Sequence, residues 1–513
     1  MTQIAQPLTT TNSSPVPLPD VPVHSFAMFA DQLCEQLRNN SSGLSALFGV
    51  PRPDRSLRLY AVTNHASAAK LAIFATDVEA RYPSLTLRVP QAHWFEREIA
   101  EQWGVVPEGH PWLKPIRFHR SYSEGRDAWG RSADDEILPS VQPAGTDYFK
   151  VRGDEIHEVA VGPIHAGVIE PGHFRFQCHG ENVFSLEIEL GFQHRGIERQ
   201  LIGGPNKRTL HYMETLSGDA SIAHSAAYCQ LLEGLAGVEA PLRAQAIRCI
   251  AMELERLANH TGDLGALAQD VGFLPTASFC GRLRGDWLNA SALLCGNRFG
   301  RSLVRPGGVR FNLDDGMIAD LQSRVEVAFR DLAGAANLLW STPTVTARFE
   351  DCGTVTRSMA DEIGLVGMAA RACDIDRDAR RDFPFSMYRF HQIPVSTWHT
   401  GDVFGRAYVR WLEIQRSVRF IQDQLRVLPK TATQCEIPPL QPDSLIVSLT
   451  EGWRGEICHV AITDSDGRFA DYKVIDPSFH NWIGLSMALR NQEISDFPVN
   501  NKSFNLSYCG HDL

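Results

Sequence analysis

The 513-residue sequence contains no CxxC pair, no long apolar run and no basic, apolar leader at its start. Its 11 cysteines are scattered, which is typical of reduced thiols in a cytosolic protein and excludes a disulfide framework. The missing CxxC pairs also argue against an iron–sulfur cluster on this chain. Because no run of about twenty apolar residues occurs, we expect no membrane span and a cytoplasmic protein.

Charge and composition narrow the class of protein further. The formal net charge is -11 and is spread along the chain, which argues against binding nucleic acid or an anionic membrane by charge alone. With 43% hydrophobic residues, the chain has enough apolar side chains for sizeable cores. Its length predicts two or more globular domains.

Changes in composition along the chain predict four segments. Residues 1–22 are rich in Thr, Ser and Pro and predict a disordered tail. Residues 23–121 combine a helical pattern with strand-like runs, which indicates a small α+β domain. The charged, apolar-poor residues of 122–145 predict a linker. Residues 146–513 then form a large domain, mainly helical with β-hairpins, so the expected fold class is α+β.

Periodicity predicts individual elements within these domains. Phe26, Phe29, Leu33 and Leu37 fall on one face of a helix. We expect strands at residues 57–64, 84–90 and 184–192, long helices near 313–340 and 401–427, and a hairpin turning at Asp466-Gly467.

The stretch from Gly162 to Cys229 contains three distinctive phrases, GPIHAGVIEPGHFRF, LGFQHRGIER and LHYMETLSGDASIAHSAAYC. Glycine and proline in the first phrase fix tight turns around His165 and leave its imidazole near a loop tip. The third phrase predicts the start of a helix, for which Ser217 and Asp219 are capping candidates.

Together, and in this order, the three phrases resemble the large subunit of NiFe hydrogenases and the related quinone-site subunit of respiratory complex I. The first phrase is most similar to membrane-bound, energy-converting hydrogenases of the formate hydrogenlyase and hydrogenase-four type. A further phrase, WFEREIAEQWGVVPEGHPWLKPI from Trp94 to Ile116, resembles the small partner subunit that some complex I chains carry as a fusion. The resemblance implies that this N-terminal module docks against the large domain.

The resemblance also implies a metal-binding frame, which this sequence does not keep. The family's CGxCxxxH frame matches Gly218 and His224, and its closing cysteine pair matches Cys509. The other three thiolate positions hold Ser217, Ala220 and Leu506. Soft thiolates select nickel and iron, and alanine and leucine offer no donor atom. The resemblance therefore implies a member without the metal centre, and we expect no metal ligands.

The resemblance implies a second use of this fold: the complex I subunit has lost the four cysteines and binds a quinone through a histidine and a tyrosine. His165 matches the histidine, but Gly218 stands at the tyrosine position, so Tyr212 and Tyr508 are the nearby candidates. We expect His165 and Asp219 to be catalytic, with the carboxylate polarising the imidazole. The expected quinone-like pocket comprises His165, Ser217, Gly218, Ala220, His224, Leu506 and Cys509.

Structural roles remain open for these same residues. His165 is equally consistent with a turn histidine bonded to the backbone, Asp219 with a helix cap and His224 with a packed helix residue. For the chain as a whole, a non-catalytic scaffold that couples a partner to an ion-translocating membrane arm is the main alternative. A hydrogenase with unusual ligation is the other, although one cysteine cannot hold two metals.

The resemblance implies a subunit of a membrane-associated oxidoreductase, peripheral on the inner face of the cell membrane. It would pass electrons from an iron–sulfur small subunit to a quinone or another acceptor. Membrane antiporter-like subunits would be further partners, whereas nucleic acid is not expected to bind. No cofactor is expected to be held by this chain itself, apart from a possible quinone.

Overall fold

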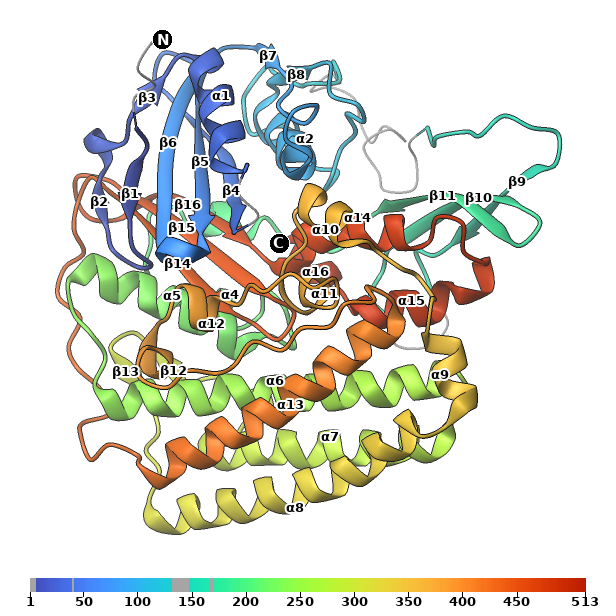
Figure 1. The fold of residues 1–513 in the computed structure, drawn as a ribbon. Coiled ribbons are helices and arrows are strands. Elements are labelled where there is room, and N and C mark those ends of the chain that lie inside the picture. The colour runs from blue at the N-terminus through green and yellow to red at the C-terminus, as the bar shows by residue number, and fades with distance from the viewer. Residues whose placement is uncertain (1–5, 39–40, 132–146, 166–168) are drawn as a thin grey trace.

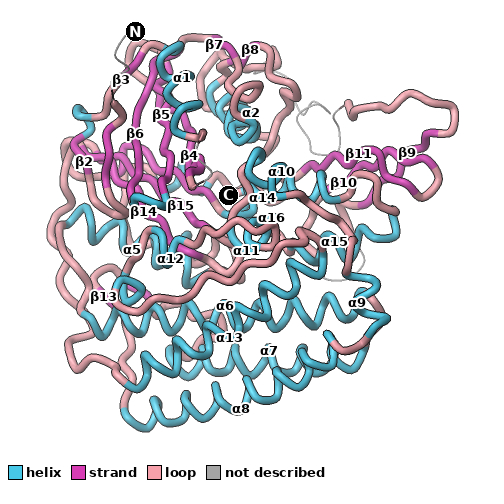
Figure 2. Tube along the Cα trace, viewed as in Figure 1, coloured by secondary structure: helices cyan, strands magenta, loops and turns pink. Residues whose placement is uncertain are grey.

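The computed structural model describes residues 6–38, 41–131, 147–165 and 169–513 (Figure 1). Most of the strands lie in the upper part of the molecule, and long helices form the layer beneath them (Figure 2). Helices and strands are segregated along the chain rather than alternating as βαβ units. The predicted α+β class is therefore confirmed.

The N-terminal sheet is built from β1 (Leu8–Thr10), β6 (Lys70–Val78), β5 (Leu57–His65) and β4 (Ser42–Pro51), in that order. β3 (Val23–His24) adds to β6 in parallel. The predicted helix forms as α1 (Phe26–Gln36), and its Phe29 packs on Phe74 of β6 with 5.2 Å between ring centroids. The strand predicted at 57–64 is β5.

The prediction of a disordered tail at residues 1–22 is wrong from residue 6 onward, and residues 1–5 lie outside the described part. β1 pairs with β6, while β2 (Val16–Pro17) pairs with β14 (Ser444–Glu451) of the large domain. Between the two strands, Asn12 accepts a hydrogen bond from the Leu449 amide and donates to the Phe383 carbonyl. The segment is ordered because distant strands supply its backbone partners, which composition does not reveal.

The strand predicted at 84–90 is also wrong, because a buried carboxylate draws this segment into turns. Glu96 accepts hydrogen bonds from the Ser84 hydroxyl, the Leu85 amide and both the amide and the hydroxyl of Thr86. These local bonds replace the ladder that a strand would need. Parallel strands β7 (Arg81–Pro83) and β8 (Val106–Glu108) flank the segment.

Helix α2 (His93–Trp103) joins the N-terminal sheet to the rest of the chain. Its Glu98 is fully buried and forms ion pairs with Arg117 and with Lys473 of β16 (Phe469–Ile475). Burial opposes ionisation of Glu98, but the two cations outweigh it and lower its pKa to about 2. A buried charge cluster therefore fixes α2 to the large domain, as the docking phrase predicted. The predicted linker at 122–145 lies mostly outside the described residues.

The central sheet of the large domain has the order β16-β15-β14-β2, with β15 at Glu456–Thr463. The predicted hairpin at Asp466-Gly467 is confirmed, and Gly467 takes the positive φ of 73° that its turn requires. Helix α5 (Ser221–Ala236) packs across β14 and β15.

Four long helices form the lower layer: α6 (Leu242–Asp270), α7 (Leu274–Cys295), α8 (Asp315–Trp340) and α13 (Val403–Arg426). The helices predicted near 313–340 and 401–427 are α8 and α13, each within two residues. The short strands β12 (Val304–Arg305) and β13 (Gly308–Val309) pair with each other. The shorter helices are α3 (Ile197–Leu201), α4 (Thr209–Met213), α9 (Pro343–Phe349), α10 (Arg357–Ile363), α11 (Gly367–Arg371), α12 (Ala379–Asp382), α14 (Pro477–Ala488), α15 (Phe497–Phe504) and α16 (Tyr508–Asp512).

A three-stranded sheet projects from the right of the molecule in Figure 1. Its order is β11-β10-β9, with β9 at Ile156–Val161, β10 at His173–His179 and β11 at Asn182–Glu189. The strand predicted at 184–192 corresponds to β11. The turn between β9 and β10 contains His165, so this sheet presents the loop of interest to the body of the protein.

A buried ionic cluster ties α13 to α6 and α11. Glu413 of α13 lies 3.1 Å from Arg256, 2.7 Å from Arg371 and 2.9 Å from His260, and all four side chains are buried. Burial opposes the charge on Glu413, but its cationic neighbours hold its pKa well below the usual range. Removing Glu413 would break buried ion pairs in the core, while both arginines would keep a second carboxylate partner.

Candidate functional site

The loop between β9 and β10 is held in a tight path by its glycines. Gly162 has a φ of 83°, and a Cβ atom there would lie 2.0 Å from the Gly172 carbonyl oxygen, so only glycine fits. This close approach brings His165 back across the loop, where its Nε2 donates to the Gly172 carbonyl at 2.9 Å. His165 therefore forms the backbone hydrogen bond within a turn that was expected if its role is structural. The same side chain also lines a cavity described below.

The two halves of the predicted metal-binding frame meet in space. The Ser217 hydroxyl lies 2.9 Å from that of Ser507, which precedes α16, and Ser507 lies 3.4 Å from Cys509 Sγ. These segments are 290 residues apart in sequence. The two segments that the sequence predicted to form one site, around Ser217 and around Cys509, are therefore in contact in the fold.

A charged pair lies at this junction. Asp219 Oδ1 and Oδ2 accept hydrogen bonds at 2.7 and 2.8 Å from the two terminal nitrogens of Arg454, whose guanidinium stacks 3.9 Å above the Trp453 ring. Ser217 adds a third hydrogen bond to Asp219 at 3.0 Å. Burial disfavours the carboxylate, but Arg454 and Ser217 outweigh it and lower the pKa of Asp219. Asp219 is therefore an anion at neutral pH, already matched by a cation.

The prediction that Ser217 or Asp219 caps helix α5 is wrong. The first turn of α5 is satisfied instead by Glu255 of α6, which accepts hydrogen bonds from the amides of Ile222 at 2.7 Å and Ala223 at 3.3 Å. Burial raises the pKa of Glu255 to about 8 despite these bonds. The cap comes from another helix, and this leaves Asp219 free to pair with Arg454.

His224 belongs to a separate buried cluster. Its Nε2 donates to Asp476 at 3.0 Å, and its Nδ1 lies 3.1 Å from Nε2 of His459, with all three side chains fully buried. His224 is therefore a packed helix residue, which was one of the two roles expected for it. Its hydrogen-bond partners are His459 on β15 and Asp476 at the start of α14.

A cavity of about 510 Å³ opens beside the Asp219–Arg454 pair. Two residues of the predicted quinone-like pocket, His165 and Leu506, line it, as does the predicted catalytic residue Asp219. Ser217, Gly218, Ala220, His224 and Cys509 are not among its described lining residues. Ser217 lies behind Asp219, where it supports the carboxylate, and Ala220 is buried at the start of α5.

The structure distinguishes between the two candidate tyrosines. Tyr508 lines the cavity, buried against Trp482 with 4.8 Å between ring centroids. Its hydroxyl lies near Asn501, and burial raises its pKa to about 12, so it remains a proton donor at neutral pH. Tyr212 instead packs against the helical core.

Sequence reasoning missed four charged residues of the cavity: Glu170, Arg454, Asp270 and Lys502. Glu170 lies within the phrase GPIHAGVIEPGHFRF. Arg454 had a signal, because it sits in the phrase EGWRGE, which resembles a phrase of the hydrogenase and complex I superfamily. Asp270 ends α6 and Lys502 lies on α15, and neither belongs to a recognisable motif. The remaining walls are mainly apolar, from Val161, Ile169, Phe176, Phe497 and Leu506.

The side chains at the former thiolate positions do not fit a nickel–iron centre. The Ser217 hydroxyl is hydrogen-bonded to Asp219 and to Ser507, while Ala220 and Leu506 have no donor atom. Burial raises the pKa of the Cys509 thiol to about 11, so the sulfur keeps its proton at neutral pH. Within the described ranges, no three His, Cys, Asp or Glu side chains are grouped to hold a metal ion.

Comparison with known proteins gives the same relationships as the sequence phrases. Residues 25–126 match the family described as the respiratory-chain NADH dehydrogenase 30 Kd subunit, and residues 270–443 match the 49 Kd subunit. The chain is 30% identical to formate hydrogenlyase subunit 5 of Escherichia coli over 434 residues, 82% of this chain and 74% of that protein.

Two further relatives represent other branches. Hydrogenase-4 component G of Escherichia coli is 28% identical over 431 residues, covering 82% of this chain and 74% of the relative. NADH-quinone oxidoreductase subunit 4 of Thermus thermophilus is 27% identical over 369 residues, covering 67% of this chain and 90% of the relative. The alignments with the two Escherichia coli proteins are longer than residues 146–513, so they extend into the N-terminal module as well.

Proposed function

This chain belongs to the family of energy-converting hydrogenase large subunits and fused complex I subunits, and from that premise we propose that it is a quinone-reducing subunit without a nickel–iron centre. The observation that supports this best is the cavity beside the former metal position. It joins an imidazole, an arginine–aspartate pair and a tyrosine to apolar walls, in His165, Arg454, Asp219 and Tyr508. A cavity of about 510 Å³ suits a ring-shaped ligand with two polar ends.

The polar groups suit the chemistry of quinone reduction, which takes up two electrons and two protons. Electrons would arrive from an iron–sulfur cluster on a partner subunit. The guanidinium of Arg454 would stabilise negative charge that develops on a carbonyl oxygen. Nε2 of His165 is bonded to the Gly172 carbonyl, so its proton exchange with the ligand would run through Nδ1.

Asp219 would act as a positioning residue in this scheme. It is ionised and held by Arg454 and Ser217, so it orients the guanidinium rather than supplying a proton. The tyrosine hydroxyl of Tyr508 would be the second hydrogen-bond donor to the ligand. Our sequence-based assignment of Asp219 as a partner that polarises His165 is therefore replaced by a role through Arg454.

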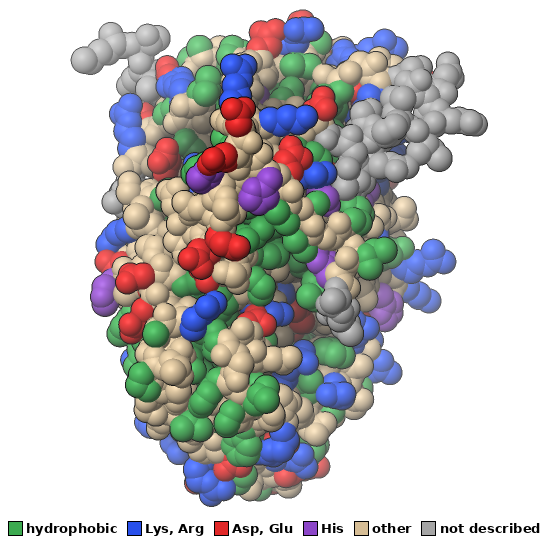
Figure 3. Space-filling model, turned by 90° about the vertical axis from the view of Figure 1, so that its right-hand side faces the viewer, with side chains coloured by type: hydrophobic (Ala, Val, Ile, Leu, Met, Phe, Trp, Pro, Cys, Tyr) green, Lys and Arg blue, Asp and Glu red, His purple; other side chains and the backbone are tan. Residues whose placement is uncertain are grey.

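The surroundings of the site support assembly with partners. Within the described ranges, no helix combines the length and apolar character needed to cross a bilayer. The face that carries β9–β11 displays several hydrophobic patches (Figure 3), and Ile164, beside His165, is 92% exposed. An exposed large apolar side chain next to a functional loop suggests a docking surface. We propose an iron–sulfur small subunit there, with membrane antiporter-like subunits anchoring the complex on the inner face of the cell membrane.

The domain division belongs to the same proposal: an N-terminal docking module at 23–121, a linker at 122–145 and a large domain at 146–513. The module would hold the large domain in the complex through the buried pair of Glu98 with Lys473. Strands β1 and β2 would then connect the two domains, because β1 pairs with β6 of the module and β2 pairs with β14 of the large domain.

Two measurements test the proposal. The intact complex, purified with its partners, should reduce a soluble quinone analogue, and His165→Ala should lower the turnover at least ~100-fold. His179→Ala is the matched control, because it removes a histidine of the same sheet that pairs with the exposed Glu155, away from the cavity lining. Metal analysis should find nickel far below one atom per chain. Near-stoichiometric nickel would overturn the metal-free assignment, and a complex without quinone turnover would favour a non-catalytic scaffold.

A further inference from the structure

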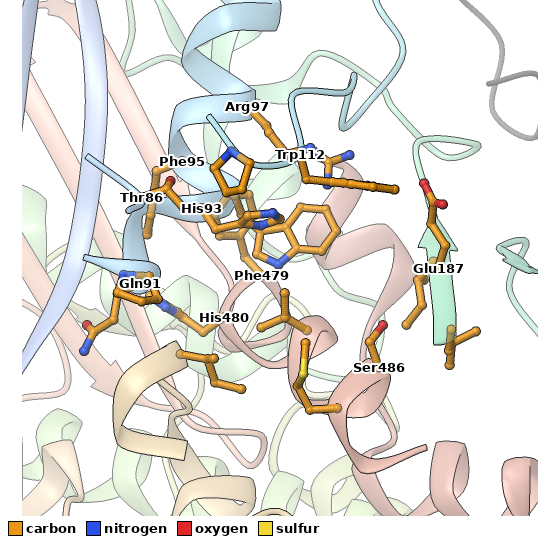
Figure 4. Close-up of a pocket in the computed structure, with 18 of the residues that line it drawn as sticks. Thr86, Gln91, His93, Phe95, Arg97, Trp112, Glu187, Phe479, His480 and Ser486 are labelled. Carbon is orange, nitrogen blue, oxygen red and sulfur yellow. The ribbon is translucent and has the colours of Figure 1, made fainter. Parts of the chain in front are cut away.

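A second cavity, of about 440 Å³, lies between α2, β11 and α14 and is separate from the His165 cavity. Arg97 and Trp112 lie at one end, His480 and Ser486 lie at the other, and Glu187 of β11 faces them from the side (Figure 4). Because α2 belongs to the N-terminal module and α14 to the large domain, this cavity is formed where the two meet.

The walls of this seam cavity are largely aromatic. Trp112 and Phe149 contact each other edge-to-face with 5.8 Å between ring centroids, and Trp94 lies 6.5 Å from Phe479. Aliphatic side chains of β11 and α14, among them Ile188 and Ile483, complete the lining. A concave apolar space of this size is typical of sites for small amphipathic ligands.

Two buried donors at the cavity are incompletely matched. Arg97 is only 5% exposed, and its guanidinium donates to the backbone carbonyls of Lys114 and Pro115 at 2.8 Å each. None of the described carboxylates forms a direct ion pair with it, and Glu187, Glu101 and Glu189 favour its charge only from a distance. Trp94 is 8% exposed, and its indole Nε1 has no hydrogen-bond partner among the described residues. Unmatched buried donors of this kind require an explanation.

The charge balance of the cavity favours an anion over a cation. Arg97 and Arg490 line it, and the one lining carboxylate, Glu187, is already paired with Lys114. The histidines add no positive charge, because burial lowers the pKa of His480 to about 4 and that of His93 well below its usual value. The lining of the cavity therefore includes two arginines and a single glutamate whose charge is matched by Lys114.

We propose that the seam cavity binds an amphipathic carboxylate, with its apolar chain or ring between Trp112 and Phe479 and its carboxylate on Arg97 and Trp94. An arginine fork matches a carboxylate geometrically, and the ligand would give Arg97 the direct ion pair that none of the described carboxylates forms with it. The Arg97 guanidinium lies 4.6 Å from the Trp94 ring centroid, so one head group can reach both donors. The site is independent of the quinone proposal and spans the two modules of the chain.

The test uses the full-length chain and two probes of equal chain length, decanoate and decanol. Each is titrated by calorimetry and by tryptophan fluorescence, which Trp94 and Trp112 should report directly. Decanoate should bind one molecule per chain, at least ~10-fold more tightly than decanol, because only the acid pairs with Arg97. Arg97→Gln should remove most of this difference, while Arg324→Gln, on the exposed face of α8, should leave it unchanged.

A second variant keeps the test decisive if loss of Arg97 prevents folding. Ser486 is partly exposed on α14 and lines the cavity, so Ser486→Phe should fill the space and abolish binding of both probes. Equal affinity for decanoate and decanol in the native chain would overturn the proposal, as would a site that survives Ser486→Phe. Absence of saturable decanoate binding to the native chain would overturn it as well.

Discussion

The guanidinium of Arg454 binds both carboxylate oxygens of Asp219, at 2.7 and 2.8 Å, beside the place where the family resemblance positions two thiolates. Arg454 is almost fully buried, while the Asp219 side chain keeps 32% of its surface exposed toward the cavity. The pair holds a positive group at the edge of an apolar space without leaving a net buried charge.

Breaking this pair should destabilise the fold and disrupt the cavity. Asp219→Ala leaves Arg454 buried without its counter-ion, and we expect the free energy of unfolding to fall by about 3 kcal/mol. Arg454→Ala should cost less, about 2 kcal/mol, because Asp219 can be hydrated from the cavity. Chemical denaturation of both variants and of the double variant measures the coupling. Arg324→Ala breaks the exposed pair with Asp320 and should cost under ~0.5 kcal/mol; equal effects at the two sites would contradict this view.

The hydroxyl of Tyr508 should contribute to ligand binding rather than to stability. Tyr508→Phe keeps the ring that packs on Trp482 and removes only the donor, so the affinity for a quinone analogue should fall ~10-fold with little change in Tm. Tyr212→Phe is the matched control, because Tyr212 lies in the helical core packing rather than in the cavity. Equilibrium binding to the assembled complex measures both. An effect of Tyr212→Phe larger than that of Tyr508→Phe would reverse the assignment.

Glu255 should make stability fall as pH rises from about 4.5 to about 8. Its pKa is raised to about 8 in the fold from an ordinary 4.5, so between these values the folded chain holds a proton that the unfolded chain has released. The contribution is full below the lower value and lost above the upper one, at most ~1.4 kcal/mol per pH unit.

Glu255→Gln isolates this effect, because the amide oxygen can still accept hydrogen bonds from Ile222 and Ala223. Denaturation curves at several pH values between 5 and 8 should show a slope that is ~1 kcal/mol per pH unit shallower than in the native chain. Glu326→Gln on the exposed face of α8 should leave the slope unchanged. A native slope retained by Glu255→Gln would place the titration elsewhere.

Glu413 should be among the most sensitive positions of the helical layer. Glu413→Gln removes the charge that Arg256 and Arg371 share, and we expect a loss of about 3–5 kcal/mol in the free energy of unfolding. Asp423→Asn on the same helix breaks pairs with the exposed Arg419 and Arg426 and with His391, and it should cost less than ~1 kcal/mol. Thermal denaturation distinguishes the two; similar losses would mean that burial does not govern these pairs.

Local sequence was sufficient to predict the features that depend on neighbouring residues. Periodicity located α1, α8 and α13, because an apolar stripe at helical spacing has one favourable arrangement. Asp466-Gly467 set the hairpin turn, since Gly467 takes a positive φ there. The lack of a donor atom at Ala220 and Leu506, two positions where the family resemblance implies thiolates, was also visible in the residues themselves, because no structure is needed to exclude such side chains as ligands.

Tertiary structure decided what depends on distant partners. The polar segment before Val23 forms strands because two remote sheets pair with its backbone. Residues 84–90 leave the strand conformation because the buried Glu96 binds their amides and hydroxyls. The cap of α5 comes from Glu255 on another helix, and the partner of Asp219 is 235 residues away. The local sequence pattern reflects helix and strand propensity and hydrophobic periodicity. The partners of buried hydrogen-bonding and charged groups are instead set by the fold, which brings together residues that are distant in the sequence.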